Sequence, residues 1–222
     1  TEEERTKAHT LLDFLTPIIK TWPSEYGPKA NYFAIQVLGG SGYVNEHPVE
    51  MMYRDNRLNP IHEGTTGIQS LDLLARKVPQ NGLAGYTACI EAIHETIAEA
   101  RGRDELDGFA DELESAVATL KEVTDFLLGS MLEKNIDLVL ANSVKYLDVF
   151  GNVVIAWMWL KQGVAASKGL ACASSVADEN FYRGKLQAMR YFFRYELPEI
   201  NAWDNLLMTL DDTTHSMKVD WL

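Results

Sequence analysis

Apolar residues recur with the spacing of an α-helix along almost the entire chain of 222 residues. One clear stripe lies between about residues 106 and 132, and its members are Leu113, Val117, Leu120, Val123, Phe126 and Leu127. A longer pattern, at about residues 136–167, is apolar on nearly every side between residues 153 and 160, which is typical of a helix at the centre of a bundle. No part of the chain has the pattern of a β-domain. The sequence therefore predicts an all-α protein.

The chain is expected to divide into two helical units that meet near residue 78. Val78 and Pro79 begin a segment that ends at Gly82 and has the composition of a helix stop. We therefore predict that residues 1–78 are the end of an up-down helical bundle. Residues 79–222 are then a second, additional helical bundle.

The first unit is expected to begin with two separate helices. Thr1 and Glu4 have the spacing of a capping box, so a helix should start there and continue to about Lys20. The segment Trp22-Pro23-Ser24 predicts a turn, because proline removes a backbone donor and clashes with the preceding helical turn. A second helix should then lead to Gly39.

Charge and composition exclude several classes of protein. The formal net charge of −12 argues against nucleic acid and anionic membrane surfaces as partners. The chain has no uncharged run of transmembrane length and no signal segment at Thr1. Cys89 and Cys172 fit no metal or redox spacing, so we expect a reduced, cytoplasmic protein.

Two features of the second unit have both a functional and a structural interpretation. Glu91 and His94 share a helical face that a metal site could use, but no second such pair exists, so we expect no metal. Trp157 and Trp159 could line a ligand cavity, although aromatic residues of a central helix usually belong to the core.

The stretch from Gln36 to Lys77 carries the features that point to chemistry. A glycine-rich loop follows the second helix, and the run His62-Glu63-Gly64-Thr65-Thr66-Gly67 stands just before another helical pattern. Thr65 or Thr66 is a good N-cap, which places Glu63 at the open end of that helix. Glu63 could act there as a general base, or it could simply complement the helix dipole.

The glycine loop was compared with the dinucleotide fingerprint of a Rossmann fold. Gly40-Ser41-Gly42 lacks the third glycine and follows a helix, not a strand, so a Rossmann site is not expected. A helix C-cap formed by glycine is one role of this loop.

Several blocks in this stretch occur in an order and spacing that resemble the C-terminal helical domain of acyl-CoA dehydrogenases. The blocks are QVLGGSGY at 36–43, PVE at 48–50, YRD at 53–55, EGT at 63–65, IQ at 68–69 and LDLLARK at 71–77. The resemblance covers about residues 5–78. The LDLLARK ending and the long helical tail look like the extended-length branch of the family.

The resemblance implies a reaction and a base. Glu63 matches the carboxylate that removes the pro-R α-proton of an acyl-CoA thioester while the β-hydrogen leaves as a hydride to FAD, which gives a trans-2-enoyl-CoA. In the family the backbone N–H of that residue and a flavin ribityl hydroxyl hold the thioester carbonyl. Reduced flavin would pass its electrons to an electron-transfer flavoprotein.

The resemblance also implies contacts with cofactor and substrate. Gln36, Gly39 and Gly40 match residues that contact FAD across a subunit interface, which implies a homo-oligomer. Thr65 matches a cofactor contact. Gly67 also matches a cofactor-binding position, where it replaces the glutamine of shorter members. His62, Glu63 and Gly64 match positions that bind the substrate, and His62 stands beside the thioester where the family usually has a tyrosine.

The chain lacks the N-terminal helical domain and the middle β-domain that hold flavin and CoA in the family. We therefore predict that it is a C-terminal segment of a longer enzyme, and that alone it neither binds FAD tightly nor turns over substrate. The alternative is a non-catalytic helical module that serves oligomerisation or interaction.

Overall fold

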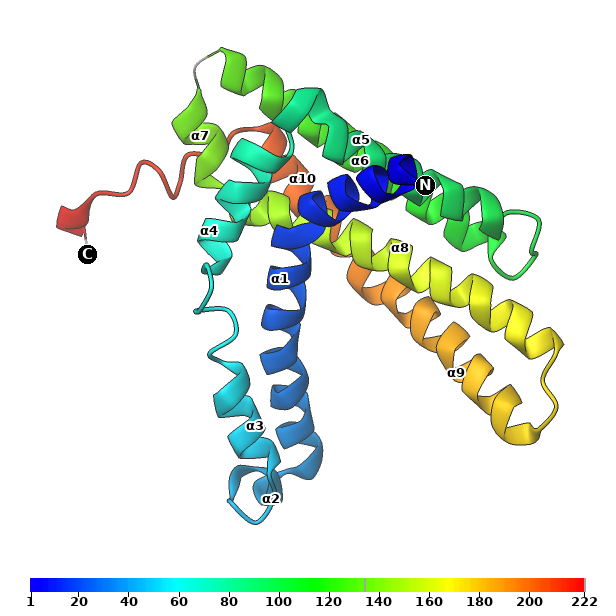
Figure 1. The fold of residues 1–222 in the computed structure, drawn as a ribbon. Coiled ribbons are helices and arrows are strands. Elements are labelled where there is room, and N and C mark those ends of the chain that lie inside the picture. The colour runs from blue at the N-terminus through cyan, green and yellow to red at the C-terminus, as the bar shows by residue number, and fades with distance from the viewer. Residues whose placement is uncertain (134, 222) are drawn as a thin grey trace.

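The computed structural model describes residues 1–133 and 135–221, and this part of the chain contains helices and turns but no strand (Figure 1). The first helices are α1 (Glu2–Leu38), α2 (Gly40–Tyr43), α3 (Val49–Asn56) and α4 (Thr66–Leu71), which continues as the π-helical segment η1 (Asp72–Lys77). The later ones are α5 (Gln80–Ala100), α6 (Asp107–Leu132), α7 (Ile136–Ala141), α8 (Ser143–Ala171), α9 (Val176–Tyr191), η2 (Phe192–Glu196), η3 (Leu197–Glu199), α10 (Ile200–Met208) and η4 (Val219–Trp221). The predicted all-α fold is confirmed.

An arm extends from the rest of the molecule. It consists of the second half of α1 together with α2 and α3, which packs back against α1, and in Figure 1 it runs downward away from the other helices. The first half of α1 instead packs against α5 and α8. Helix α1 therefore belongs to both parts: its first half packs with the remaining helices and its second half forms the arm.

The predicted break at Trp22-Pro23-Ser24 is wrong, because α1 is a single helix of 37 residues that contains Pro17, Pro23 and Pro28. Two local interactions favour continuity. The rings of Trp22 and Tyr26 stack with centroids 3.7 Å apart, a contact that the i,i+4 spacing of a helix provides. Ser24 Oγ donates a hydrogen bond to the Thr21 carbonyl at 2.8 Å. The capping box of Thr1 and Glu4 is present as predicted.

The core is one cluster of buried apolar side chains, and its members come from both sides of residue 78 in the sequence. Phe14 and Ile18 of α1 and Leu73 and Leu74 of η1 belong to it, together with residues of α5, α6 and α8. The helix predicted to be central, α8, packs against α4, α5, α6, α9 and α10. The division into two units at residue 78 stays a prediction.

Helix α8 is long and apolar enough to cross a membrane, the one such helix among the described residues, but 67% of its apolar window is buried inside the bundle. Trp157 is a core residue, and its indole N–H donates to Thr96 Oγ1 at 2.7 Å. Half-buried Trp159 instead lines a cavity beside α1. The two tryptophans thus take different roles on one helix.

Helix α5 begins with a left-handed turn and then packs closely on α1. Asn81, Gly82 and Leu83 have φ angles of 51°, 66° and 68°, where the sequence predicts a helix stop. A Cβ atom at Gly85 would lie 2.8 Å from Phe14 Cβ, so the two helices approach closely because glycine stands there.

Candidate active site

The predicted site residues lie on two separate exposed loops. Gln36, Gly39 and Gly40 are at the end of the arm, whereas His62 to Thr65 lie in the turn between α3 and α4 and Gly67 lies at the start of α4 (Figure 1). The carbonyl of Gly64 is hydrogen-bonded to Lys20, which lies midway along α1. At ~1.5 Å of rise per residue, the part of α1 from Lys20 to Gly39 spans about 28 Å. One chain therefore does not bring the two loops together.

The turn that carries Glu63 has an unusual backbone. Glu63 and Gly64 have φ angles of 53° and 88°, both in the left-handed region. The φ angle of Gly64 favours glycine, and a Cβ atom there would lie 2.6 Å from Gln69 Nε2 and displace that amide. The side chain of Glu63 is exposed.

Two side chains hold the carbonyl groups of this turn. Gln69 Nε2 donates to the Glu63 carbonyl at 3.1 Å. Half-buried Lys20 donates through Nζ to the carbonyls of Gly64 at 2.6 Å and Asn59 at 2.9 Å. The carbonyls of Asn59, Glu63 and Gly64 are thus bound by side chains, while the Glu63 side chain is exposed.

Helix α4 is fixed to its neighbours directly after the turn. Thr65 caps the helix, since its Oγ1 accepts from the Ile68 N–H at 3.4 Å, and this confirms the predicted cap. The Thr66 hydroxyl donates to the Glu25 carboxylate on α1. Ser70 Oγ lies 2.9 Å from Ser143 Oγ, which joins the helix to α8.

His62 is exposed beside Glu63. Its Nδ1 lies 3.0 Å from the Leu58 carbonyl, and its backbone N–H donates to the same oxygen at 3.2 Å. The imidazole therefore lies back toward Leu58, one turn earlier in the chain.

Gly39 and Gly40 of the glycine loop are exposed, whereas Gly42 is buried against α1. Gly39 has a φ angle of 60° and ends α1, which confirms the glycine C-cap. Cβ atoms at Gly39, Gly40 or Gly67 would meet nothing within 4 Å. The side chain of Gln36 is exposed, and its Nε2 donates to the Tyr32 hydroxyl at 3.2 Å. The backbone at Gly39, Gly40 and Gly67 is therefore open to close approach by a ligand.

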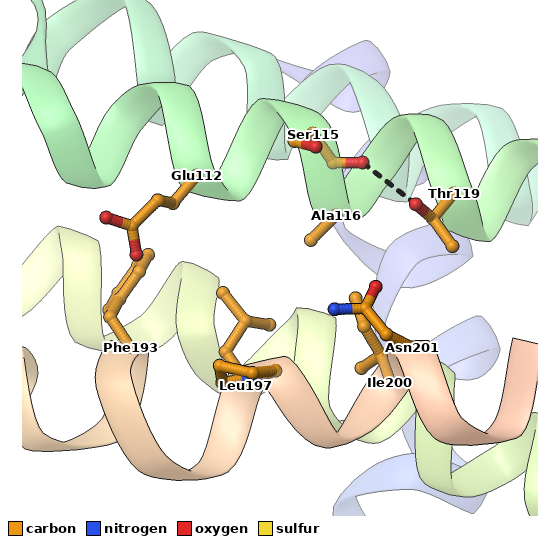
Figure 2. Close-up of a pocket in the computed structure, with 9 residues that line it drawn as sticks. Glu112, Ser115, Ala116, Thr119, Phe193, Leu197, Ile200 and Asn201 are labelled. Carbon is orange, nitrogen blue, oxygen red and sulfur yellow. Dashed lines mark hydrogen bonds between the residues drawn. The ribbon is translucent and has the colours of Figure 1, made fainter.

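Two cavities among the described residues lie away from the turn at Glu63. Figure 2 shows one of about 180 Å³ between α6 and the η2–α10 segment, and its lining includes Glu112, Ser115, Thr119, Phe193 and Asn201. Another, of about 390 Å³, lies between α1 and the α8–α9 pair and is largely aromatic, with Trp22, Tyr26, Phe33, Trp159 and Phe192. Neither cavity is lined by Glu63.

The aromatic cavity contains one strong polar contact. The Tyr26 hydroxyl donates to Glu196 Oε2 at 2.8 Å. Burial is the main reason why the pKa of Tyr26 lies well above its usual value, and the hydrogen bond to the Glu196 carboxylate raises this pKa further. Lys29 Nζ lies 3.6 Å from the same oxygen. Within residues 1–133 and 135–221, no group of three or more His, Cys, Asp or Glu side chains is placed to hold a metal ion.

Sequence reasoning located the turn but missed Lys20 and Gln69 as the residues that hold it. Lys20 appears in the sequence only as the end of a predicted helix, and its partner Gly64 lies far along the chain. Gln69 belongs to one of the recognised blocks, but the block does not show what its side chain contacts.

Two family models match the chain. Residues 4–78 match the model described as acyl-CoA dehydrogenase, C-terminal domain, and residues 89–218 match the model described as acetyl-CoA dehydrogenase C-terminal like. The two matches together cover both the arm and the helices that follow it.

Curated relatives match over most of the chain. It is 26% identical over 205 residues to the broad-specificity linear acyl-CoA dehydrogenase FadE5 of Mycobacterium tuberculosis. It is 32% identical over 202 residues to the 3-methylmercaptopropionyl-CoA dehydrogenase of Ruegeria pomeroyi, and 27% identical over 212 residues to a butyryl-CoA dehydrogenase of Syntrophomonas wolfei. These matches cover 90%, 90% and 95% of this chain and 34% of each relative, so the chain spans about a third of their length.

Proposed function

The chain belongs to the acyl-CoA dehydrogenase family, and on this premise we propose that it is the C-terminal part of a flavin-dependent acyl-CoA dehydrogenase in which Glu63 is the catalytic base. The observation that carries the proposal is the turn at Glu63. Its carbonyls are bound by Lys20 and Gln69, while its carboxylate faces outward directly before α4. A carboxylate presented in this way can accept a proton from a substrate laid over the turn.

The proposed chemistry divides the work between two groups. Glu63 removes the α-proton of an acyl-CoA thioester, and the electrons of that C–H bond form the new double bond as the β-hydrogen leaves. When bound, the flavin supplies the acceptor for that hydride. No hydrogen bond from the Glu63 N–H is found among the described residues, so this group is available to hold the thioester carbonyl as it gains negative charge.

The separation of the two loops supports a homo-oligomer with flavin bound near subunit boundaries. A span of about 28 Å exceeds what one reacting centre requires, so Glu63 and the glycine loop serve different flavins. Thr65 and Gly67 contact the flavin that reacts at Glu63. Gln36, Gly39 and Gly40 contact the flavin of a neighbouring subunit.

The substrate is proposed only as an acyl-CoA thioester. The relatives are named for linear acyl-CoA, for 3-methylmercaptopropionyl-CoA and for butyryl-CoA, so their names do not agree on one acyl chain. His62 and Gly64 flank the base and are proposed to contact the thioester end of the substrate. The proposed electron acceptor is an electron-transfer flavoprotein.

A non-catalytic interaction module is the second candidate function. The arm favours it, because apolar side chains such as Phe33 and Val37 are 54% and 86% exposed and would be covered by another protein surface. Both functions use this surface, so they differ only in what Glu63 does.

The deciding experiment uses the full-length protein that contains this chain. Wild type, Glu63→Gln and the control Glu46→Gln, which changes an exposed carboxylate between α2 and α3, are mixed anaerobically with a panel of acyl-CoA thioesters. We expect flavin bleaching with wild type and Glu46→Gln, and a loss of at least a thousandfold in rate with Glu63→Gln while flavin stays bound. Undiminished bleaching in Glu63→Gln would leave the chain as an interaction module.

A further inference from the structure

Lys20 connects α1 to the turn of the proposed base. Its ammonium donates to the carbonyls of Asn59 and Gly64, at 2.9 Å and 2.6 Å, across the bend between α3 and α4. These two carbonyls stand on either side of His62 and Glu63 in the sequence. Hydrogen bonds from a charged donor are stronger than those between neutral groups. The two bonds therefore hold the backbone before His62 and the backbone after Glu63 close to the same ammonium group.

Gln69 adds a second hold on the same turn. Its amide donates to the Glu63 carbonyl at 3.1 Å, so the consecutive carbonyls of Glu63 and Gly64 are bound by different side chains from different helices. Their directions follow from the left-handed conformation of both residues. With both carbonyls bound, the backbone at Glu63 is restricted, and with it the direction in which the side chain leaves the turn.

We propose that Lys20 and Gln69 are the positioning residues of Glu63 and hold its carboxylate and N–H in the geometry that proton abstraction requires. This inference rests on the proposed function of Glu63. Neither side chain touches the substrate, because both are occupied with the backbone beneath the turn. Their loss therefore lowers the rate of the chemical step, which depends on orientation, more than it weakens substrate binding.

The test uses the full-length flavoprotein with three lysine variants. Lys20→Met removes the ammonium and keeps most of the stem, Lys20→Arg keeps a charged donor, and Lys29→Met is the control on the same helix, where Lys29 pairs with Glu196. Stopped-flow flavin reduction gives the limiting rate and the acyl-CoA concentration at half of that rate. In Lys20→Met we expect the limiting rate to fall at least tenfold with less than a threefold change in half-saturation. Lys20→Arg should recover at least part of the loss, and Lys29→Met should behave as wild type.

Gln69→Met provides an independent test if Lys20→Met does not fold or loses its flavin. We expect its limiting rate to fall at least fivefold, again with little change in half-saturation. Wild-type limiting rates in Gln69→Met and in any folded Lys20→Met would overturn the positioning role. So would a loss expressed only as weaker substrate binding.

Failure of the proposed function is distinguishable in the same series. If Glu63→Gln reduces its flavin at the wild-type rate, Glu63 is not the base, whatever the Lys20 variants do. If Glu63→Gln is inactive while Lys20→Met and Gln69→Met are fully active, the base stands and only the positioning role is rejected.

Discussion

Glu63 holds a backbone conformation that ordinary residues avoid. A residue other than glycine in the left-handed region costs roughly 1–2 kcal/mol. Each hydrogen bond contributes about 0.5–1.5 kcal/mol net, so the bonds from Lys20 and Gln69 are of the right size to offset that cost. The left-handed backbone of the turn is therefore stabilised by Gln69, which is near Glu63 in the sequence, and by Lys20, which is far from it.

The two cysteines are expected to differ in reactivity. Cys89 is buried between helices, and burial raises the pKa of its thiol to about 12, whereas Cys172 is exposed at the end of α8. At pH 8 the Cys89 thiol stays protonated, and the thiolate is the form that reacts. A maleimide should label one thiol in the native chain, none in Cys172→Ser, and two in denaturant. Labelling of native Cys172→Ser within minutes would show that the core around Cys89 opens readily.

At the scale of single residues, the sequence reveals roles that depend on near neighbours. Thr65 is identifiable as a cap because the cap and its partner Ile68 are three positions apart. Lys20 is not identifiable as a partner of Gly64, because that contact exists only once α1 and the turn have folded together. The direction of the Glu63 side chain was inaccessible from sequence for the same reason.

At the scale of elements, α1 shows why local signals placed its boundaries incorrectly. Each proline removes one backbone donor, and the sequence alone makes Pro23 a sensible place for a break. Packing decides otherwise, since Phe14 and Ile18 are buried against the core and the Trp22–Tyr26 stack spans the expected turn. The π-helical segment after α4 was likewise invisible, because the Val78 N–H reaches the Leu73 carbonyl only in the packed helix.

The contact between α1 and α5 can be tested at Gly85. In Gly85→Ala the new Cβ would stand 2.8 Å from Phe14 Cβ, an atom next to the backbone that cannot move aside easily. We expect the free energy of unfolding to fall by about 1–3 kcal/mol in urea denaturation. The control Gly184→Ala, in a helix with nothing within 4 Å of the new atom, should gain about 0.5–1 kcal/mol. Equal stability of the two variants would mean that α1 and α5 are less closely packed than described.

At the scale of the whole molecule, the chain presents its proposed chemistry on open surfaces. Glu63 lines neither the aromatic cavity nor the one shown in Figure 2, and the glycine loop stands at the end of an arm. The sequence was sufficient to predict the helical fold and both loops. It could not show that the loops lie far apart, because that separation depends on the unbroken length of α1.

The isolated chain is therefore expected to fold but to lack activity. Circular dichroism should show a helical protein, since its core is formed by its own residues. After incubation with excess FAD and gel filtration, the chain should retain well under one flavin per molecule, because neither loop encloses the cofactor. It should also fail to oxidise acyl-CoA in the presence of an artificial electron acceptor. Stoichiometric flavin, or turnover, would show that these 222 residues make a complete site.

The core cluster contains residues from both sides of residue 78, and it therefore limits how far the chain can be shortened without loss of folding. Leu73, Leu74 and Val78 are fully buried, and their cover comes partly from α5 and α8. A version trimmed after residue 78 would turn these side chains toward water, and each large apolar side chain so exposed costs about 1.5–3 kcal/mol. Helices α5 and α8 hold no proposed catalytic group, but they cover the apolar side of η1, the segment that continues the helix after Glu63.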